Sequence, residues 1–208
     1  MKMKKGGVRK ISGKSIREAA KLVLGGGVIV YPTDTVYGLG CDPMNELAAR
    51  RVFAIKGRGG KPVPVLCDSL ESASRLVRFS GRARQLAKDY WPGALTIVLP
   101  LRAELPELIH QGSGTLGVRV PNSRSCLELI SACGGHLIGT SANRSRKPAC
   151  RTAQEAIQSI GEEVDLILDG GILSEKESTV VKVSENRVEI LRSGAVTVAN
   201  LPQRTLRR

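Results

Sequence analysis

The sequence is poor in aromatic residues and in long apolar runs, and each shortage excludes a class of protein. Phe, Trp and Tyr make up 3% of the 208 residues, too few for platforms that stack successive nucleic-acid bases. The strongest apolar runs, VIVYP and LTIVLPL, are only as long as strands, so we predict that the chain does not span a membrane. The basic N-terminus leads into no apolar segment long enough for a signal-peptide core.

Histidine and cysteine are too scattered to form a zinc site. The two histidines, His110 and His136, have no second candidate ligand nearby, and the five cysteines include no CxxC pair. Carboxylates form no cluster that would cage a metal ion, so we expect no metal site built by the protein alone. An odd number of dispersed cysteines without a signal peptide is typical of a reduced, cytoplasmic protein.

Acidic residues are also in short supply, since 19 Asp and Glu face 32 Lys and Arg, a formal charge of +13. Such an excess is typical of proteins that bind nucleic acid, nucleotides or an acidic membrane. Eight of the cations lie in the first ten residues and in the closing RTLRR. We therefore predict a basic N-terminal arm over 1–11 and a basic tail over 201–208, around a single domain over 12–200.

Apolar runs alternate with segments of helical period, which is the pattern of an α/β protein. SIREAAKLVLGGG, with a capping-box pattern at Ser15 and Glu18, predicts the first helix. Further helices are predicted over 45–56, 71–91 (two pieces), 123–133 and 152–160. Strands are predicted over 28–34, 62–68, 94–101, 115–121, 136–142, 164–170, 178–184 and 187–193. Several late strands follow one another without a helix, so the sheet is predicted to be mixed and flanked by helices.

Two phosphate-binding motifs almost occur, and both are rejected. GVRKISGKS has one residue too many before Gly13-Lys14-Ser15 to be a P-loop, and no strand precedes it. GSGTLG, residues 112–117, is followed by a predicted strand, so no helix N-terminus is available to receive a pyrophosphate. If this protein binds a nucleotide, it does so by another route.

Two loops place polar groups where a ligand would find them. Thr33, Thr35 and Tyr37 are spaced by two, so their hydroxyls share one side of an extended segment; ordinary solvated threonines beside a buried tyrosine fit equally well. Lys56 and Arg58 end a helical segment and are followed by glycines, an arrangement suited to a phosphate chain. A solvated basic helix end is the alternative. Both cations are expected to be exposed.

A third loop, GTSANRSRKPA, decides between these readings. The predicted strand over 136–142 delivers Thr140, Ser141 and Asn143 at its carboxyl end, where α/β sheets bind ligands. Three cations follow in the same loop: Arg144, Arg146 and Lys147. A turn that caps the next segment, with its cations in water, explains this loop alone. It does not explain the combination with the other two loops.

Seven segments, in the same order, resemble a known family. They are YPTDTVYGLG, KGR, WPGALTIVLP, GVRVP, GTSANRSRKPA, STVVKV and ILRSGAV. Over roughly residues 12–196 the chain resembles the YrdC/TsaC family of threonylcarbamoyl-AMP synthases, in its single-domain form. The resemblance implies a twisted α/β sheet with a basic concave face. It also implies a reaction in which L-threonine, bicarbonate and ATP give threonylcarbamoyl-AMP and pyrophosphate, for the N6-threonylcarbamoyladenosine modification of tRNA.

The resemblance also implies roles for individual residues. Four match the family's KxR and SxN motif and are expected to hold ATP and support catalysis: Lys56, Arg58, Ser141 and Asn143. Thr140 and Arg192 are expected to join them at the nucleotide. The expected threonine-binding residues are Thr33, Thr35, Tyr37, Arg119 and Ser178. Mg²⁺ would arrive with ATP, and tRNA and a downstream threonylcarbamoyl transferase would be partners.

The chain departs from the family pattern next to these residues. Gly59-Gly60 follow the KxR segment where a proline is common, Leu66 and Cys67 stand where many relatives carry a histidine, and Ser193 replaces a common proline. Two other functions remain open at this point. Residues 50–91 hold ten cations and three acids, so the protein could bind double-stranded RNA or tRNA without catalysis. It could also form a carbamoyl-adenylate, as YrdC-like domains of hydrogenase maturation factors do.

Overall fold

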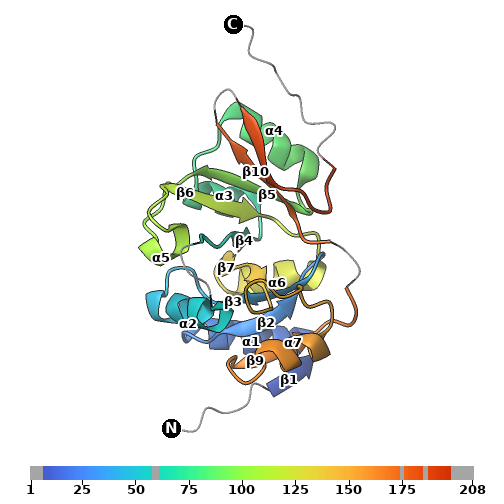
Figure 1. Ribbon diagram of the computed structural model, residues 1–208. Helices are drawn as coiled ribbons and strands as arrows, with labels where there is room; N and C mark the ends of the chain where they lie inside the picture. Colours follow the sequence, from blue (N-terminus) through green and yellow to red (C-terminus); the bar gives the residue numbers. More distant parts are fainter. Residues whose placement is uncertain (1–6, 58–60, 174–175, 185–186, 198–208) are drawn as a thin grey trace, which may run out of the picture.

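The computed structural model describes residues 7–57, 61–173, 176–184 and 187–197. Their strands form two mixed sheets (Figure 1). The five-stranded sheet has the order β1 (Gly7–Lys10), β9 (Leu166–Asp169), β2 (Ile29–Pro32), β3 (Tyr37–Gly40) and β8 (Thr140–Ser141). The six-stranded sheet has the order β11 (Val188–Arg192), β10 (Thr179–Val183), β5 (Leu95–Pro100), β6 (Thr115–Arg119), β4 (Val65–Cys67) and β7 (His136–Ile138). The predicted mixed α/β class is confirmed, with two sheets where one was expected.

Helices cover the outer faces of the sheets (Figure 1). They are α1 (Gly13–Leu24), α2 (Glu46–Lys56), α3 (Leu70–Leu76), α4 (Gly81–Tyr90), α5 (Glu107–His110), α6 (Arg124–Ala132) and α7 (Ala153–Ile160). Helix α6 packs against α1 and β4, and so links the two halves of the molecule. None of these described helices has both the length and the apolar character needed to cross a membrane.

The start of α1 differs from its prediction. Ser12, and not Ser15, is the N-cap: its hydroxyl accepts from Ser15 N at 3.2 Å, while Ser15 Oγ accepts from Ser12 N at 2.9 Å. Ser15 is buried and its hydroxyl also donates to Lys10 O at 2.9 Å. The predicted capping box at Ser15 and Glu18 is wrong. Two serines spaced by three can form the two reciprocal hydrogen bonds of a capping box, so the helix begins after Ser12 and Ser15 lies in its first turn.

Part of the predicted N-terminal arm belongs to the fold. Residues 7–10 form β1, which pairs in parallel with β9, and Ile11 N donates to Asp169 O at 3.0 Å. The arm over 1–11 is therefore wrong for residues 7–11. Backbone groups of an edge strand bond to their neighbour whatever the side chains are, and cations are common on exposed edges. Residues 1–6 and 198–208, including the predicted tail, lie outside the described residues.

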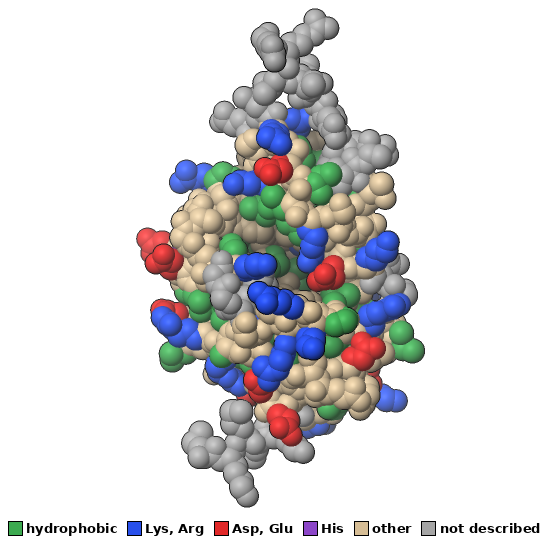
Figure 2. All heavy atoms as spheres, viewed as in Figure 1, with side chains coloured by type: hydrophobic (Ala, Val, Ile, Leu, Met, Phe, Trp, Pro, Cys, Tyr) green, Lys and Arg blue, Asp and Glu red, His purple; other side chains and the backbone are tan. Residues whose placement is uncertain are grey.

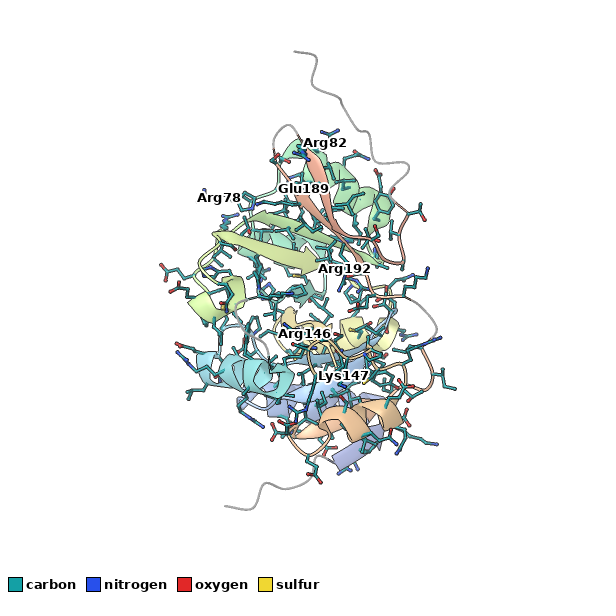
Figure 3. The ribbon with its side chains drawn as sticks, viewed as in Figure 1. Arg78, Arg82, Arg146, Lys147, Glu189 and Arg192 are labelled. Carbon is teal, nitrogen blue, oxygen red and sulfur yellow. The ribbon has the colours of Figure 1, made fainter. Side chains whose placement is uncertain are left out.

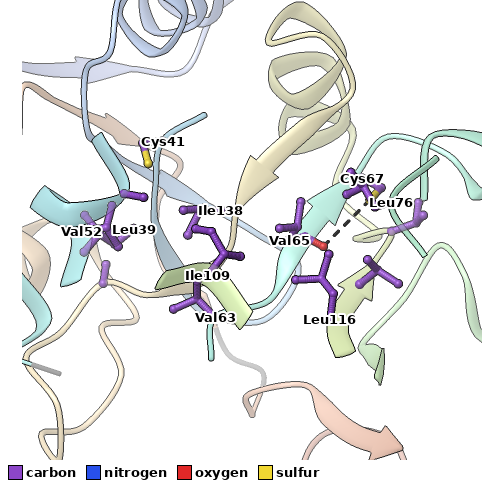
Figure 4. Packing of buried hydrophobic residues seen from close by; sticks show 14 of the residues in the cluster. Leu39, Cys41, Val52, Val63, Val65, Cys67, Leu76, Ile109, Leu116 and Ile138 are labelled. Atoms are coloured by element: carbon purple, nitrogen blue, oxygen red, sulfur yellow. Dashed lines mark hydrogen bonds between the residues drawn. The ribbon is translucent and has the colours of Figure 1, made fainter. Parts of the chain in front are cut away.

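The larger of two hydrophobic clusters connects the sheets. Leu39 of β3, Val65 of β4, Leu116 of β6 and Ile138 of β7 all belong to it and are fully buried (Figure 4). All five cysteines are buried and free, and burial raises the pKa of Cys41 to about 12. A thiol with such a pKa stays protonated at neutral pH, so these cysteines serve as small apolar core residues.

The sheets meet where β3 passes β7. A Cβ added at Gly40 would lie 2.1 Å from Ile138 O, so only glycine fits. At the same place Ile138 N donates to Cys41 O at 2.9 Å, and the buried Tyr31 hydroxyl donates to Ile138 O at 2.6 Å. The predicted strand over 136–142 breaks at Gly139 directly afterwards. Its first part, β7, stays in the six-stranded sheet and its second part, β8, joins the five-stranded sheet.

We expect Gly40→Ala to lower the free energy of unfolding by about 3 kcal/mol, because the new methyl group would push β3 away from the backbone of β7. Urea denaturation measures this change. Gly81→Ala is the matched control, since a Cβ there meets nothing within 4 Å and alanine favours the first turn of α4. Equal stability of the two variants would show that the contact between the sheets tolerates a side chain.

Candidate functional site

A cavity of about 360 Å³ lies between the two sheets. In the space-filling view it opens as a hollow on one face, with Lys and Arg side chains around it (Figure 2). Eight of the predicted site residues line it: Thr33, Thr35, Tyr37, Arg119, Thr140, Ser141, Ser178 and Arg192. Thr33, Thr35, Tyr37, Thr140 and Ser141 come from the five-stranded sheet and its loops. Arg119, Ser178 and Arg192 come from the six-stranded sheet and its loops. Residues up to 159 positions apart, Thr33 and Arg192, thus share one cavity.

The loop after β2 presents two threonine hydroxyls together. Thr33 Oγ1 lies 3.0 Å from Thr35 Oγ1, accepts from Thr35 N at 3.0 Å and donates to Val36 O at 2.7 Å. These bonds form a local turn in which a threonine side chain replaces a backbone partner. The turn holds both hydroxyls at the cavity wall.

Arg119 reaches the same threonines from β6. Its Nη1 donates to Thr35 Oγ1 at 3.1 Å, its Nη2 to Asp34 Oδ1 at 2.5 Å and its Nε to Gly93 O at 2.9 Å. The side chain is almost fully buried, and Asp34 neutralises its charge. Each terminal nitrogen of a guanidinium carries two N–H groups, so Nη1 and Nη2 each keep one to offer to a ligand. The rigid fork suits a carboxylate.

Tyr37 lies beside the threonines but its hydroxyl bonds elsewhere. It donates to Gly171 O at 2.7 Å and accepts from Gly170 N at 3.0 Å. Burial raises the pKa of Tyr37, so the hydroxyl stays protonated at neutral pH. The sequence predicted that the hydroxyls of Thr33, Thr35 and Tyr37 share one side. The structure brings the two threonine hydroxyls together, whereas the Tyr37 hydroxyl holds the loop after β9.

Ser178 and Arg192 form a second polar group across the cavity. Ser178 Oγ lies 2.9 Å from Thr96 Oγ1 and accepts from Arg192 Nη2 at 3.1 Å. Arg192 also donates to Ser178 O and, from Nη1, to Glu177 Oε1 at 3.1 Å. Sequence reasoning missed Thr96 and Glu177 in this group. Thr96 had a signal, because it is a polar residue inside an otherwise apolar strand.

Lys56 is buried, which contradicts its expected exposure. Its ammonium group donates to Ser141 O at 2.7 Å, to Asn143 O at 2.6 Å and to Asn143 Oδ1 at 2.9 Å, and the residue is 3% exposed. Helix α2 ends at Gly57 in the left-handed region, and the loop after β8 covers its last turn. Arg58, the second cation of the KxR segment, lies outside the described residues.

The loop after β8 is held from inside and from outside. Asn143 Nδ2 donates to Lys147 O, and Ser145 N donates to Lys56 O at 2.8 Å. On the outer side Arg144 pairs with Glu163 at 2.6 Å and donates to Ile55 O at 3.3 Å. Ser141 faces the cavity, whereas Asn143 is buried beneath the loop. In the SxN segment, Ser141 therefore lines the cavity and Asn143 holds the loop in place.

These features define a class of protein before any comparison. Two mixed sheets enclose a cavity lined by hydroxyl and guanidinium groups, which suits a small anionic ligand. In the described part of the chain, no group of three or more His, Cys, Asp or Glu could hold a metal ion. The class is an α/β domain with a cavity of hydroxyl and guanidinium groups between two mixed sheets.

Comparison with known proteins identifies the family. Residues 21–194 match the Sua5/YciO/YrdC family, described as "Telomere recombination". The threonylcarbamoyl-AMP synthase of Nitrosococcus oceani is 36% identical over 157 residues, which cover 74% of this chain and 85% of that protein. The threonylcarbamoyl-AMP synthase of Pyrococcus abyssi is 34% identical over 189 residues, 89% of this chain and 56% of that protein. The chain belongs to the Sua5/YciO/YrdC family, as the motifs indicated.

Solved structures agree with this assignment. The crystal structure of P. abyssi Sua5 complexed with L-threonine has a TM-score of 0.85 and 34% identity, covering 91% of this chain and 56% of that one. Escherichia coli YciO has a TM-score of 0.87 and 28% identity, covering 93% of this chain and 98% of that one. This chain thus spans 56% of the archaeal Sua5 chain and nearly all of YciO.

We expect Lys56→Met to lower the free energy of unfolding by about 2–4 kcal/mol, because the apolar side chain leaves the oxygens of Ser141 and Asn143 without their donor. Urea denaturation measures the loss, and hydrogen exchange should show faster exchange in residues 141–147. Lys61→Met, at an exposed position, is the matched control and should change stability by less than about 0.5 kcal/mol. Equal stability of both variants would show that the ammonium group does not hold the loop.

Proposed function

We propose that this protein is a threonylcarbamoyl-AMP synthase, which makes threonylcarbamoyl-AMP and pyrophosphate from L-threonine, bicarbonate and ATP. The observation that carries the proposal is the cavity itself. Arg119 and the paired hydroxyls of Thr33 and Thr35 stand on one side, and the loop that contains Ser141 stands on another. The names of the relatives and the L-threonine complex of P. abyssi Sua5 support it.

The threonine substrate binds at the Arg119 side in this proposal. The two unused N–H groups of the Arg119 guanidinium bind the substrate carboxylate as a fork. The hydroxyls of Thr33, Thr35 and Ser178 bind the substrate hydroxyl or the carbamate. Tyr37 acts here through the loop that its hydroxyl holds, since that hydroxyl already has two partners.

ATP binds at the loop after β8. Thr140 and Ser141 line the cavity there and hydrogen-bond to the nucleotide, while Lys56 and Asn143 keep the loop in shape. Arg192 faces them from the six-stranded sheet, and Arg58 follows Lys56 in the sequence. These cations attract the phosphates and stabilise the charge on the departing pyrophosphate.

The residue types suit this chemistry. The amine of threonine and bicarbonate form a carbamate with loss of water. The carbamate oxygen is already an anionic nucleophile that displaces pyrophosphate from the α-phosphorus, so no strong general base is required. What the reaction needs is alignment of two anions that repel each other. Mg²⁺ enters with ATP, held by the phosphate oxygens. Glu177 is the one carboxylate among the described lining residues, and it is paired with Arg192.

The product serves tRNA modification in this proposal, so tRNA and a threonylcarbamoyl transferase are its partners. Exposed cations gather on and around α3 and α4, where they can contact RNA phosphates: Arg75, Arg78, Arg84 and Lys88. These cations and the basic concave face that the family resemblance implies together form the proposed RNA contact.

Purified protein given ATP, Mg²⁺, bicarbonate and L-threonine should release pyrophosphate, and omission of either threonine or bicarbonate should abolish the release. Mass spectrometry should detect threonylcarbamoyl-AMP. Carbamoyl phosphate should not replace the two substrates; if it does, the protein forms a carbamoyl-adenylate instead. RNA binding with strong salt dependence and no pyrophosphate release would favour the non-catalytic alternative.

Arg119→Lys should raise the KM for threonine at least about tenfold and leave the KM for ATP within about twofold, because lysine keeps the charge beside Asp34 but cannot form a fork. Steady-state kinetics with each substrate varied in turn measures the split. A similar rise in both KM values would show that Arg119 maintains the shape of the cavity and does not bind threonine specifically.

A further inference from the structure

Arg146 has a backbone conformation that does not suit its side chain. Its φ is 68°, in the left-handed region that favours glycine. The one other described non-glycine residue with positive φ is Gln111, which ends α5 in a usual helix C-cap position. Arg146 ends no helix. It is the third residue of a turn closed by Lys147 N donating to Arg144 O at 3.1 Å, where glycine or asparagine is preferred.

The arginine side chain has no structural use that would explain this choice. Arg146 is exposed, and in the described part of the chain its guanidinium has no hydrogen-bond or ion-pair partner. Arg144, two residues earlier, shows the contrast, because Glu163 and Ile55 O hold it against the protein. Strain at an exposed residue that supports nothing else points to a ligand.

Arg146 belongs to a loop that begins at the cavity wall, although it is not itself a lining residue. The loop starts at Ser141, which lines the cavity, and Asn143 Nδ2 holds its far end at Lys147 O. In Figure 3 Arg146 and Lys147 lie on the five-stranded side, and Arg192, a lining residue, lies opposite on the six-stranded side. Figure 2 shows cations at the edge of the hollow on this same face.

We propose that Arg146 is a phosphate-binding residue, which contacts the polyphosphate of the nucleotide from the mouth of the cavity. The inference rests on the proposed function, since it names a further contact for the same nucleotide. The left-handed turn fixes the direction in which the Cα–Cβ bond of Arg146 leaves the backbone, and the buried bonds of Lys56 and Asn143 hold the loop that contains the turn. From this turn the planar guanidinium can bind phosphate oxygens through two parallel N–H groups.

Three substitutions separate the charge from the backbone. Arg146→Asn and Arg146→Gly remove the guanidinium but suit a positive φ, so the unfolding temperature should be unchanged or raised by up to about 4 °C. The same variants should raise the KM for ATP about tenfold, with kcat and the KM for threonine within about twofold. Arg146→Lys, which keeps the charge, should raise the KM for ATP by less than the asparagine variant does.

Arg17→Gln is the control for the general positive field, since it removes one cation from the exposed face of α1 and should leave every kinetic constant unchanged. An unchanged KM for ATP in Arg146→Asn, in the presence of active wild-type protein, would overturn the proposal. Weaker tRNA binding without a change in that KM would also overturn it and assign the guanidinium to RNA.

Failure of the proposed function gives a different result. If the wild-type protein forms no adenylate, calorimetric titration with Mg²⁺ and ATP still tests Arg146, because wild-type protein should bind ATP about tenfold more tightly than Arg146→Asn does. Equal affinities would overturn the assignment of Arg146 whatever the reaction of the protein is.

Discussion

At Gly40 the backbone of β3 touches the backbone of β7, and the two sheets are joined there. The contact leaves no room for a side chain, and it is completed by the bond from Ile138 N to Cys41 O and by the buried Tyr31 hydroxyl. Directly after Ile138, at Gly139, the chain crosses from the six-stranded sheet to the five-stranded sheet. Because the cavity is the space between the sheets, this contact determines where the threonine pair, Arg119 and the loop after β8 stand relative to one another.

Buried cations then give the cavity its detailed shape. Lys56 and Arg119 are both nearly inaccessible, and each binds oxygen atoms from segments distant in sequence. Lys56 draws carbonyl oxygens of the loop after β8 inward, whereas Arg119 connects the loop after β2 to the chain at Gly93. A charge left unpaired in such places would be costly, so each site is stable only when its whole set of partners is present. Arg146 and Lys147 of the loop after β8 are exposed and remain available for ligands.

Local patterns in the sequence predicted most of the elements and the family. The helices over 45–56 and 123–133 and the strands over 94–101 and 164–170 have apolar patterns of their own, and they appear where expected. The strands that were missed or misjudged include β1, in which two of the four residues are charged; β3, which lies in a glycine-rich segment; and the predicted strand that breaks at Gly139. Each depends on a partner strand elsewhere in the chain, and no local pattern encodes that partner.

The sequence by itself determined the α/β class, the order of the family motifs and eight of the residues that line the cavity, because these depend on residue type and short spacing. The tertiary structure alone decided what each residue does there. It made Lys56 a buried anchor, tied the Tyr37 hydroxyl to the loop after β9, and divided three adjacent cations into a fixed Arg144 and an exposed Arg146 and Lys147. Their roles follow from hydrogen-bond partners that lie up to 134 residues away, and such partners exist only once the two sheets have packed.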